Sequence, residues 1–123
     1  MTNAINWFEI PVTNFEKAKT FYETVLGVEI TNHPMENMEY GIFPYTMEGH
    51  CVGGAIVQMK DFNPSADGCC VYLNGGDDLS NALSRVESSG GKILMPKTDI
   101  QENGFIALFS DQDGNRIGLH SMK

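Results

Sequence analysis

An indole and a carboxylate lie two residues apart near the start of the chain, at Trp7 and Glu9. Apolar residues alternate with them, which is the period of a strand with one apolar face; these residues are Phe8, Ile10 and Val12. The other face therefore presents Trp7 and Glu9 together. Burial of an unpaired carboxylate costs free energy and raises its pKa, so Glu9 is a candidate general base. Trp7 is a candidate stacking platform for a flat or apolar ligand, or a plug that fills space.

A second alternating segment, predicted as a strand over residues 116–121, carries the partner groups. Gly118 and His120 are expected on the face of this strand that lines a central hollow, opposite the apolar face formed by Ile117 and Leu119. His120 is then the candidate acid that assists Glu9, and glycine at 118 leaves room for a ligand. The alternative is a structural ion pair of Glu9 with His120 or with an arginine that bridges two strands and has no catalytic role, which is the more frequent outcome for such pairs.

Three further residues are candidates for the wall of this hollow: Cys70, Tyr72 and Phe105. Cys70 is only weakly indicated as a nucleophile, because no histidine has a position beside it that the sequence defines.

A strand and a helix must position the first pair. Thr13 and Asn14 can both cap a helix start, and Glu16 stands three residues after Thr13, as a capping box requires. Apolar residues at helical spacing follow, and Gly27 supplies a left-handed end. Short strands are predicted over 28–31, 38–43 and 51–59.

The pattern then repeats. After the linker-like stretch 61–68, the sequence predicts a strand over 69–73, a helix from Asp77 or Asp78 to Gly90, a strand over 92–95 that ends at Pro96, and strands over 104–109 and 116–121 around a tight turn at 111–115. A shift of 64 positions superposes Leu79 on Phe15 and Gly91 on Gly27. We therefore expect one α+β domain over 1–123, made of two paired βαβββ modules, about 4–60 and about 68–122. The modules should form a curved mixed sheet around a central cavity, with helices on the outer face.

Composition restricts the class of partner. The 123 residues carry a net charge of −8, which argues against nucleic acids and anionic membranes. No apolar run is long enough to span a bilayer, and no signal peptide is recognised, so a cytoplasmic location is expected. The three cysteines are expected to be reduced thiols.

Two stretches resemble the vicinal oxygen chelate superfamily of glyoxalases, bleomycin-resistance proteins and extradiol dioxygenases. They are the segment Ile-Pro-Val-Thr-Asn-Phe-Glu-Lys-Ala-Lys-Thr-Phe-Tyr of the first module and Phe-Ser-Asp-Gln-Asp-Gly-Asn-Arg-Ile-Gly-Leu near the end. The chain looks closest to small glyoxalase-like relatives of lactoylglutathione lyase. The resemblance implies a homodimer and a divalent metal held by His, Gln or Glu from four equivalent strands.

The residues at those four positions depart from this pattern. Trp7 and Gly118 occupy the first and last, Cys70 or Val71 the one that opens the second module, and Ala55 or Val57 the remaining one. An indole cannot bind a metal and glycine has no side chain. We therefore expect no metal and no other cofactor. The alternative is a displaced weak site of Glu9 and His120, with Tyr72 as a poor third ligand.

The main functional hypothesis is a metal-independent protein of the glyoxalase/bleomycin-resistance type that binds a small aromatic or amphipathic molecule between its modules. One alternative is a lyase or isomerase that acts on an activated carbonyl with Glu9 as base. A second alternative is a degenerate domain that mediates dimerisation.

Overall fold

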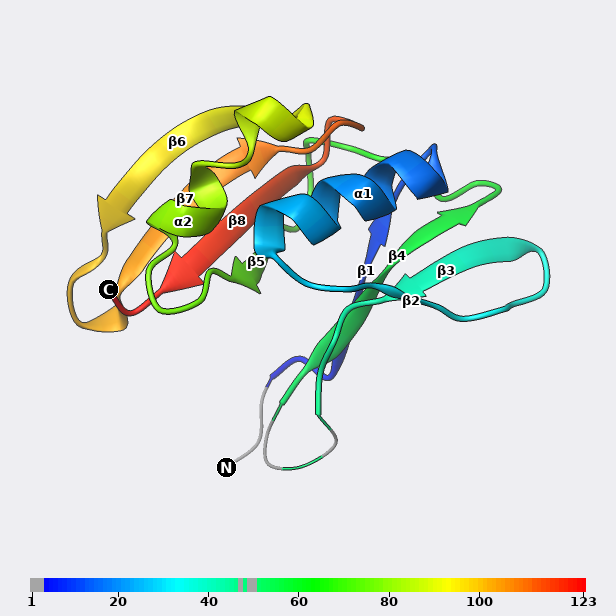
Figure 1. Ribbon diagram of the computed structural model, residues 1–123, viewed down its shortest axis with the longest axis horizontal. Helices are drawn as coiled ribbons and strands as arrows, with labels where there is room; N and C mark the ends of the chain where they lie inside the picture. Colours follow the sequence, from blue (N-terminus) through cyan, green and yellow to red (C-terminus); the bar gives the residue numbers. More distant parts are fainter. Residues whose placement is uncertain (1–3, 47, 49–50) are drawn as a thin grey trace.

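The computed structural model of the protein describes residues 4–46, 48 and 51–123 (Figure 1). The strands of the first module are β1 (Trp7–Pro11), β2 (Thr31–Asn32), β3 (Met38–Ile42) and β4 (Gly53–Met59). Those of the second module are β5 (Val71–Asn74), β6 (Lys92–Asp99), β7 (Phe105–Ser110) and β8 (Arg116–Ser121). The helical segments are α1 (Phe15–Leu26), α2 (Ser80–Leu83), η1 (Glu87–Ser89) and η2 (Gln101–Asn103).

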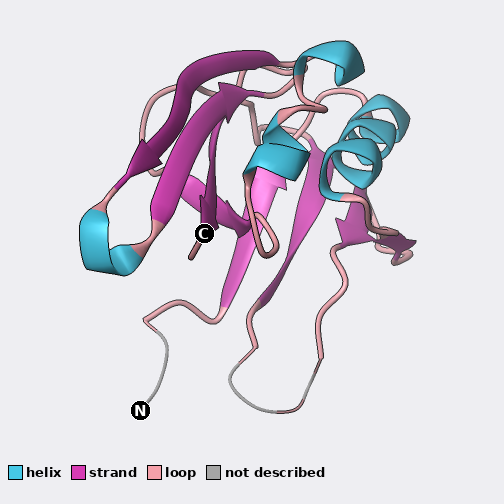
Figure 2. Ribbon diagram, turned by 60° about the vertical axis from the view of Figure 1, so that its left-hand side comes forward, coloured by secondary structure: helices cyan, strands magenta, loops and turns pink. Residues whose placement is uncertain are grey.

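The strands form two four-stranded mixed sheets with the same order, β1-β4-β3-β2 and β5-β8-β7-β6. In each sheet the first strand pairs in parallel with its neighbour, and the other pairs are antiparallel. The predicted α+β fold of two βαβββ modules is thus confirmed. The two sheets remain separate, and Figure 2 shows the longer helices beside them, while the short η2 lies in the β6–β7 connection at the end of the second sheet.

Helix α1 begins and ends at the predicted residues. Asn14, not Thr13, is the N-cap, and its side chain accepts a hydrogen bond from the Lys17 backbone N–H. Thr13 instead donates its hydroxyl to Asp113, in the second module. Gly27 ends the helix at a φ of 67°, a left-handed conformation that glycine adopts at little cost.

The second helix is shorter than predicted. It contains four regular residues and then continues through turns into η1, which Gly90 ends. Two serine hydroxyls in this stretch donate to backbone carbonyls, Ser84 to Asn81 and Ser88 to Arg85. Such bonds compete with regular helical hydrogen bonding, which explains why the apolar spacing alone overestimated the helix.

Strand β6 is longer than predicted, because it continues through Pro96 to Asp99. Proline removes a backbone donor, but β6 is an edge strand whose pairing with β7 is interrupted by register shifts. The prediction that Pro96 ends the strand was therefore wrong.

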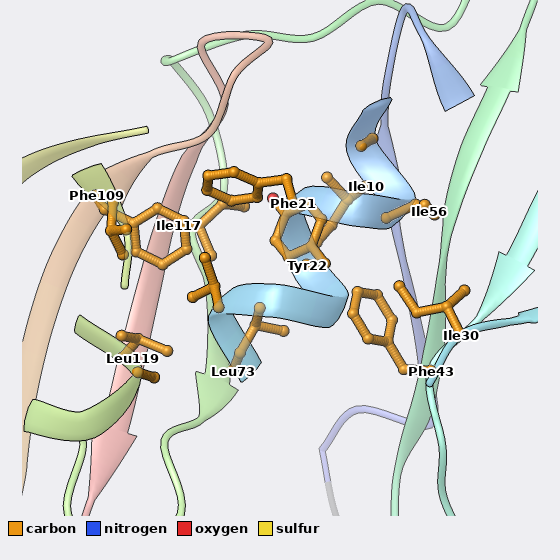
Figure 3. Packing of buried hydrophobic residues seen from close by; sticks show 14 of the residues in the cluster. Ile10, Phe21, Tyr22, Ile30, Phe43, Ile56, Leu73, Phe109, Ile117 and Leu119 are labelled. Atoms are coloured by element: carbon orange, nitrogen blue, oxygen red, sulfur yellow. The ribbon is translucent and has the colours of Figure 1, made fainter. Parts of the chain in front are cut away.

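Helix α1 packs against both sheets. The Phe21 ring lies 5.9 Å from Phe109 of β7, and the Tyr22 ring lies 5.7 Å from Phe43, next to β3. Figure 3 shows these side chains meeting between the two sheets, around α1. Leu79 from the second module belongs to the same buried cluster. Because each large buried side chain contributes about 2 kcal/mol, this shared core stabilises the pairing of the modules.

A buried polar network joins the modules at the β7–β8 turn. Asp111 accepts hydrogen bonds from the Tyr22 hydroxyl at 2.7 Å, from the Asn115 side chain and from two backbone N–H groups of the turn. Asn115 also donates to the Pro11 carbonyl of β1 at 2.7 Å. The pKa of Tyr22 is raised well above its ordinary value, first by burial and then by the Asp111 carboxylate.

Among the described residues, no helix is long and apolar enough to cross a bilayer. Cys51, Cys69 and Cys70 are free thiols.

Candidate functional site

The first sheet presents an exposed aromatic and acidic cluster on the side away from its helix. The Trp7 indole N–H donates to the Tyr40 hydroxyl at 2.8 Å, and that hydroxyl donates to Glu9 Oε2 at 2.7 Å. Strand β4 pairs with both β1 and β3, and the register of these pairs places Trp7, Glu9 and Tyr40 on the same side of the sheet. We name this surface, made of Trp7, Glu9, Tyr40 and Tyr45, the Trp7 face.

Tyr45 completes the Trp7 face. Its ring meets the indole edge-on, with centroids 5.6 Å apart and an interplanar angle of 81°. Both rings lie close over the backbone of Gly53, where an added Cβ would stand 2.7 Å from Tyr45 and 3.0 Å from Trp7. Glycine is therefore required at position 53 for the two aromatic rings to lie this close to the sheet.

The hydrogen bonds of the Trp7 face run in one direction, from indole to phenol to carboxylate. Burial of the Tyr40 hydroxyl and its hydrogen bond to Glu9 raise the pKa of Tyr40. Tyr40 therefore remains a neutral donor at physiological pH. The described residues give Glu9 Oε1 no hydrogen bond, so this oxygen is available to a ligand donor.

The corresponding side of the second sheet is built differently. Tyr72 of β5 lies opposite Gly118 of β8, and an added Cβ at Gly118 would stand 2.3 Å from the Tyr72 ring. The tyrosine thus fills the space that we expected glycine to leave open, and that expectation was wrong. His120 donates from Nε2 to the Asn103 carbonyl at 2.7 Å.

The described contacts do not bring the two predicted catalytic groups together. Glu9 is bonded to Tyr40 in the first module and His120 to Asn103 in the second. Glu9 lines a small cavity of about 120 Å³ at the seam between the modules, whose lining includes neither His120 nor Trp7. The roles of Glu9 and His120 as base and acid stay predictions.

Two of the predicted wall residues lie together, and one lies elsewhere. Cys70 and Tyr72 line a larger cavity of about 800 Å³ between the modules. Phe105 instead packs against the buried core from the helix-covered side of β7, under the ammonium group of Lys97 at 4.6 Å. Its assignment to the hollow was wrong, because Phe105 shares its strand face with the buried residues Ala107 and Phe109.

The residues at the four positions where the resemblance implies metal ligands do not fit a divalent ion. Trp7 uses its only polar atom to donate to Tyr40, and Gly118 lies under the Tyr72 ring. Ala55 and Val57 are fully buried apolar side chains. Only Cys70 remains as a donor, and one thiolate makes no site. Within residues 4–46, 48 and 51–123, no group of three His, Cys, Asp or Glu side chains gathers as a metal site would require.

Sequence reasoning missed two members of the Trp7 face. Tyr40 lies on the same face of a predicted strand as Met38 and Ile42, so its side of the sheet could have been assigned from the two-residue period. The hydrogen bond of Tyr40 with Trp7 across β4 could not have been predicted, since the strand order is a tertiary property. Tyr45 follows Pro44 in a loop and gave no periodic signal.

Known proteins with similar sequences or structures agree with this architecture. A family model described as Glyoxalase/Bleomycin resistance protein/Dioxygenase superfamily matches residues 4–119. The Mycobacterium tuberculosis protein named "Putative glyoxylase CFP32" is 27% identical over 117 residues, which cover 93% of this chain and 44% of that protein. The chain thus spans less than half the length of the curated relatives that it matches.

Two solved structures from Streptomyces sp. CB03234 are similar over nearly the whole chain. A glyoxalase/bleomycin resistance protein is 27% identical with a TM-score of 0.70, covering 95% of this chain and 100% of that one. TnmS3, described as an antibiotic binding protein, is 25% identical with a TM-score of 0.68, covering 98% of this chain and 97% of that one. With the repeated βαβββ fold and a family match over nearly all residues, the chain belongs to the Glyoxalase/Bleomycin resistance protein/Dioxygenase superfamily.

Proposed function

We propose that this protein binds a small aromatic or amphipathic molecule at the Trp7 face, without a metal ion. The hydrogen-bonded series of Trp7, Tyr40 and Glu9 is the observation that carries the proposal. Two aromatic rings offer an apolar contact surface, and Glu9 offers one carboxylate oxygen that accepts a hydrogen bond. The preferred ligand is therefore a flat ring system with a hydroxyl, amide or ammonium donor. The description of TnmS3 as an antibiotic binding protein supports the same class of function.

The chemistry of the metal positions supports metal independence. Trp7, Gly118 and the apolar residue Ala55 or Val57 occupy positions where the family implies chelating groups. The ligand must therefore be held by shape, stacking and Glu9. We therefore expect that removal of metal with EDTA leaves ligand affinity unchanged, and that Zn²⁺, Ni²⁺ or Mn²⁺ leaves the melting temperature unchanged. A stoichiometric metal bound by native side chains of the four positions would contradict the proposal.

Quenching of the single tryptophan provides a direct test. We would titrate the protein with 1-naphthylmethylamine, which carries a flat ring system and an ammonium donor, and with 1-methylnaphthalene as the control that keeps the rings and lacks the donor. The amine is expected to quench Trp7, and Glu9→Gln to weaken its binding about 10-fold, the loss expected for one charge-assisted hydrogen bond. Equal affinity of the amine for the wild type and Glu9→Gln would show that Glu9 takes no part.

The same variant tests the enzymatic alternative, in which Glu9 is the base of a lyase or isomerase. There, Glu9→Gln would abolish turnover of an activated carbonyl substrate and leave its affinity unchanged. His120, the predicted partner acid, is bonded to Asn103 and not to Glu9, so we favour binding. A dimer, predicted from the resemblance, would be measured by analytical ultracentrifugation. If it forms while no ligand binds, the dimerisation role is favoured.

A further inference from the structure

A second, larger cavity lies on the opposite side of β1 from the Trp7 face. It has a volume of about 800 Å³ and is formed between α1, α2, β1 and β5. Phe8 lines it, whereas Trp7 and Glu9, its neighbours in the alternating strand, do not. The volume is in the range of pockets that hold small organic molecules. The cavity is therefore separate from the site assigned to the proposed function.

Its walls are mainly apolar. Phe8 and Phe43 lie against each other with ring centroids 5.6 Å apart, and Leu26 of α1 and Leu73 of β5 contribute from two other elements. These side chains come from both modules, so the apolar wall exists only because the modules are paired. An apolar body of a ligand would be removed from water here, at a gain of about 25 cal/mol for each Å² buried.

One arginine gives the cavity its charge preference. The Nε of Arg85 donates to the Thr24 and Val25 carbonyls, both at 3.0 Å, at the C-terminal end of α1. These bonds hold the guanidinium group in place beside the cavity. Within the described part of the chain, the terminal Nη atoms make no hydrogen bond, and the only ion pair joins Lys97 to Asp78.

An arginine without a carboxylate partner is notable in a chain of net charge −8. One carboxylate, Asp77, also lines the cavity, but it forms no ion pair with Arg85. The two Nη atoms of a guanidinium group match the two oxygens of a carboxylate. We propose that this cavity binds an amphipathic organic carboxylate, with its apolar body against Phe8 and Phe43 and its carboxylate on the Nη atoms of Arg85.

The test compares matched probes by isothermal titration calorimetry. We expect 1-naphthoate or decanoate to bind the wild type, and the neutral analogues 1-naphthamide and decanol to bind at least 10-fold more weakly. Arg85→Gln should weaken naphthoate binding about 10- to 100-fold, the range for a hydrogen-bonded charge, and Arg85→Lys less. Arg116→Gln removes the same charge elsewhere and should change nothing.

Two further measurements keep the test decisive where Arg85→Gln fails to fold. Asn81→Trp, at an exposed position of α2 that lines the cavity, should reduce its volume and naphthoate affinity. Bound naphthoate should also slow alkylation of Cys69 and Cys70, which line the cavity, and leave the exposed Cys51 unaffected.

Three results would overturn the proposal: equal affinity of naphthoate and naphthamide, unchanged affinity in folded Arg85→Gln, or no binding of either carboxylate below about 1 mM. Glu9→Gln should leave naphthoate binding at this cavity intact. The proposal and the proposed function can therefore fail separately.

Discussion

Two tyrosines of this protein donate to a carboxylate at the same distance, and their surroundings differ completely. Tyr22 donates to Asp111 at 2.7 Å in the interior, and Tyr40 donates to Glu9 at 2.7 Å on the exposed Trp7 face. Asp111 accepts three further hydrogen bonds, from the Asn115 side chain and from backbone N–H groups of its turn. Among the described residues, Glu9 accepts only the one from Tyr40.

This difference distinguishes a carboxylate with a structural role, Asp111, from a carboxylate that can still bind a ligand, Glu9. A buried carboxylate with four donors has no capacity left for a ligand, and removing it leaves those donors without partners. An exposed carboxylate with one donor costs little free energy to maintain and can still accept a hydrogen bond. Burial and the number of partners, rather than residue type, thus distinguish the joint between the modules from the candidate site.

The largest expected effect is on the buried side of this comparison. Asp111→Ala should lower the free energy of unfolding by about 3–5 kcal/mol, because it removes the acceptor of the Tyr22 hydroxyl, of one N–H of the Asn115 amide and of two backbone N–H groups of the turn. Urea denaturation followed by circular dichroism measures it. The matched control, Glu9→Ala, should cost less than about 1 kcal/mol. Similar losses in the two variants would contradict the distinction.

The next effect is the pH dependence that Tyr22 imposes. Because the pKa of Tyr22 is raised, first by burial and then by Asp111, the folded protein holds the phenol proton more tightly than the unfolded chain does. Its stabilising contribution is complete below about pH 10, the ordinary pKa of tyrosine, and is lost as the pH rises above that value.

Unfolding at a series of alkaline pH values should show this loss in the wild type and a flatter profile in Tyr22→Phe. Tyr40→Phe is the control for a partly exposed tyrosine and should keep most of the wild-type slope. A wild-type profile that matches that of Tyr22→Phe would show that Tyr22 is not the group responsible.

A smaller effect is expected on the exposed side. Tyr40→Phe removes both hydrogen bonds of the Trp7 face, yet the free energy of unfolding should change by less than about 1 kcal/mol, because water replaces the lost partners. The emission maximum of Trp7 should shift, since its indole N–H loses the Tyr40 acceptor. Tyr72→Phe should leave the emission unchanged. An unshifted spectrum in Tyr40→Phe would disprove the hydrogen bond.

The smallest effect concerns an ion pair at the surface. Lys97 donates to Asp78 at 2.9 Å, and this hydrogen bond, with that from the Ser80 backbone, lowers the pKa of Asp78 to about 2. Lys97→Gln should move the Asp78 pKa back toward its ordinary value, measured by NMR titration. Stability in the wild type should fall slightly as the pH drops from about 4 toward 2, since the folded form favours the carboxylate. An unchanged Asp78 pKa in the variant would contradict this account.

Several elements could be predicted because local rules determine them. The alternation around Ile10 predicted the strand and which of its sides faces the helix. Gly27 predicted the end of α1, and the tight turn predicted at 111–115 contains Gly114 at a φ of 85°. Prediction failed where neighbours overrode local preference. Pro96 was tolerated because β6 is an edge strand, and serine hydroxyls interrupted the second helix.

The sequence by itself determined the fold class, the repeat of two modules and the loss of chelating side chains at Trp7 and Gly118, because each depends on residue type and period. Tertiary structure alone decided which groups meet. It placed Tyr40 between Trp7 and Glu9 across β4, laid Tyr72 over Gly118, and kept His120 bonded within its own module. The physical reason is that strand order and module pairing are set by burial of the shared core, whose contacts join residues far apart in the chain.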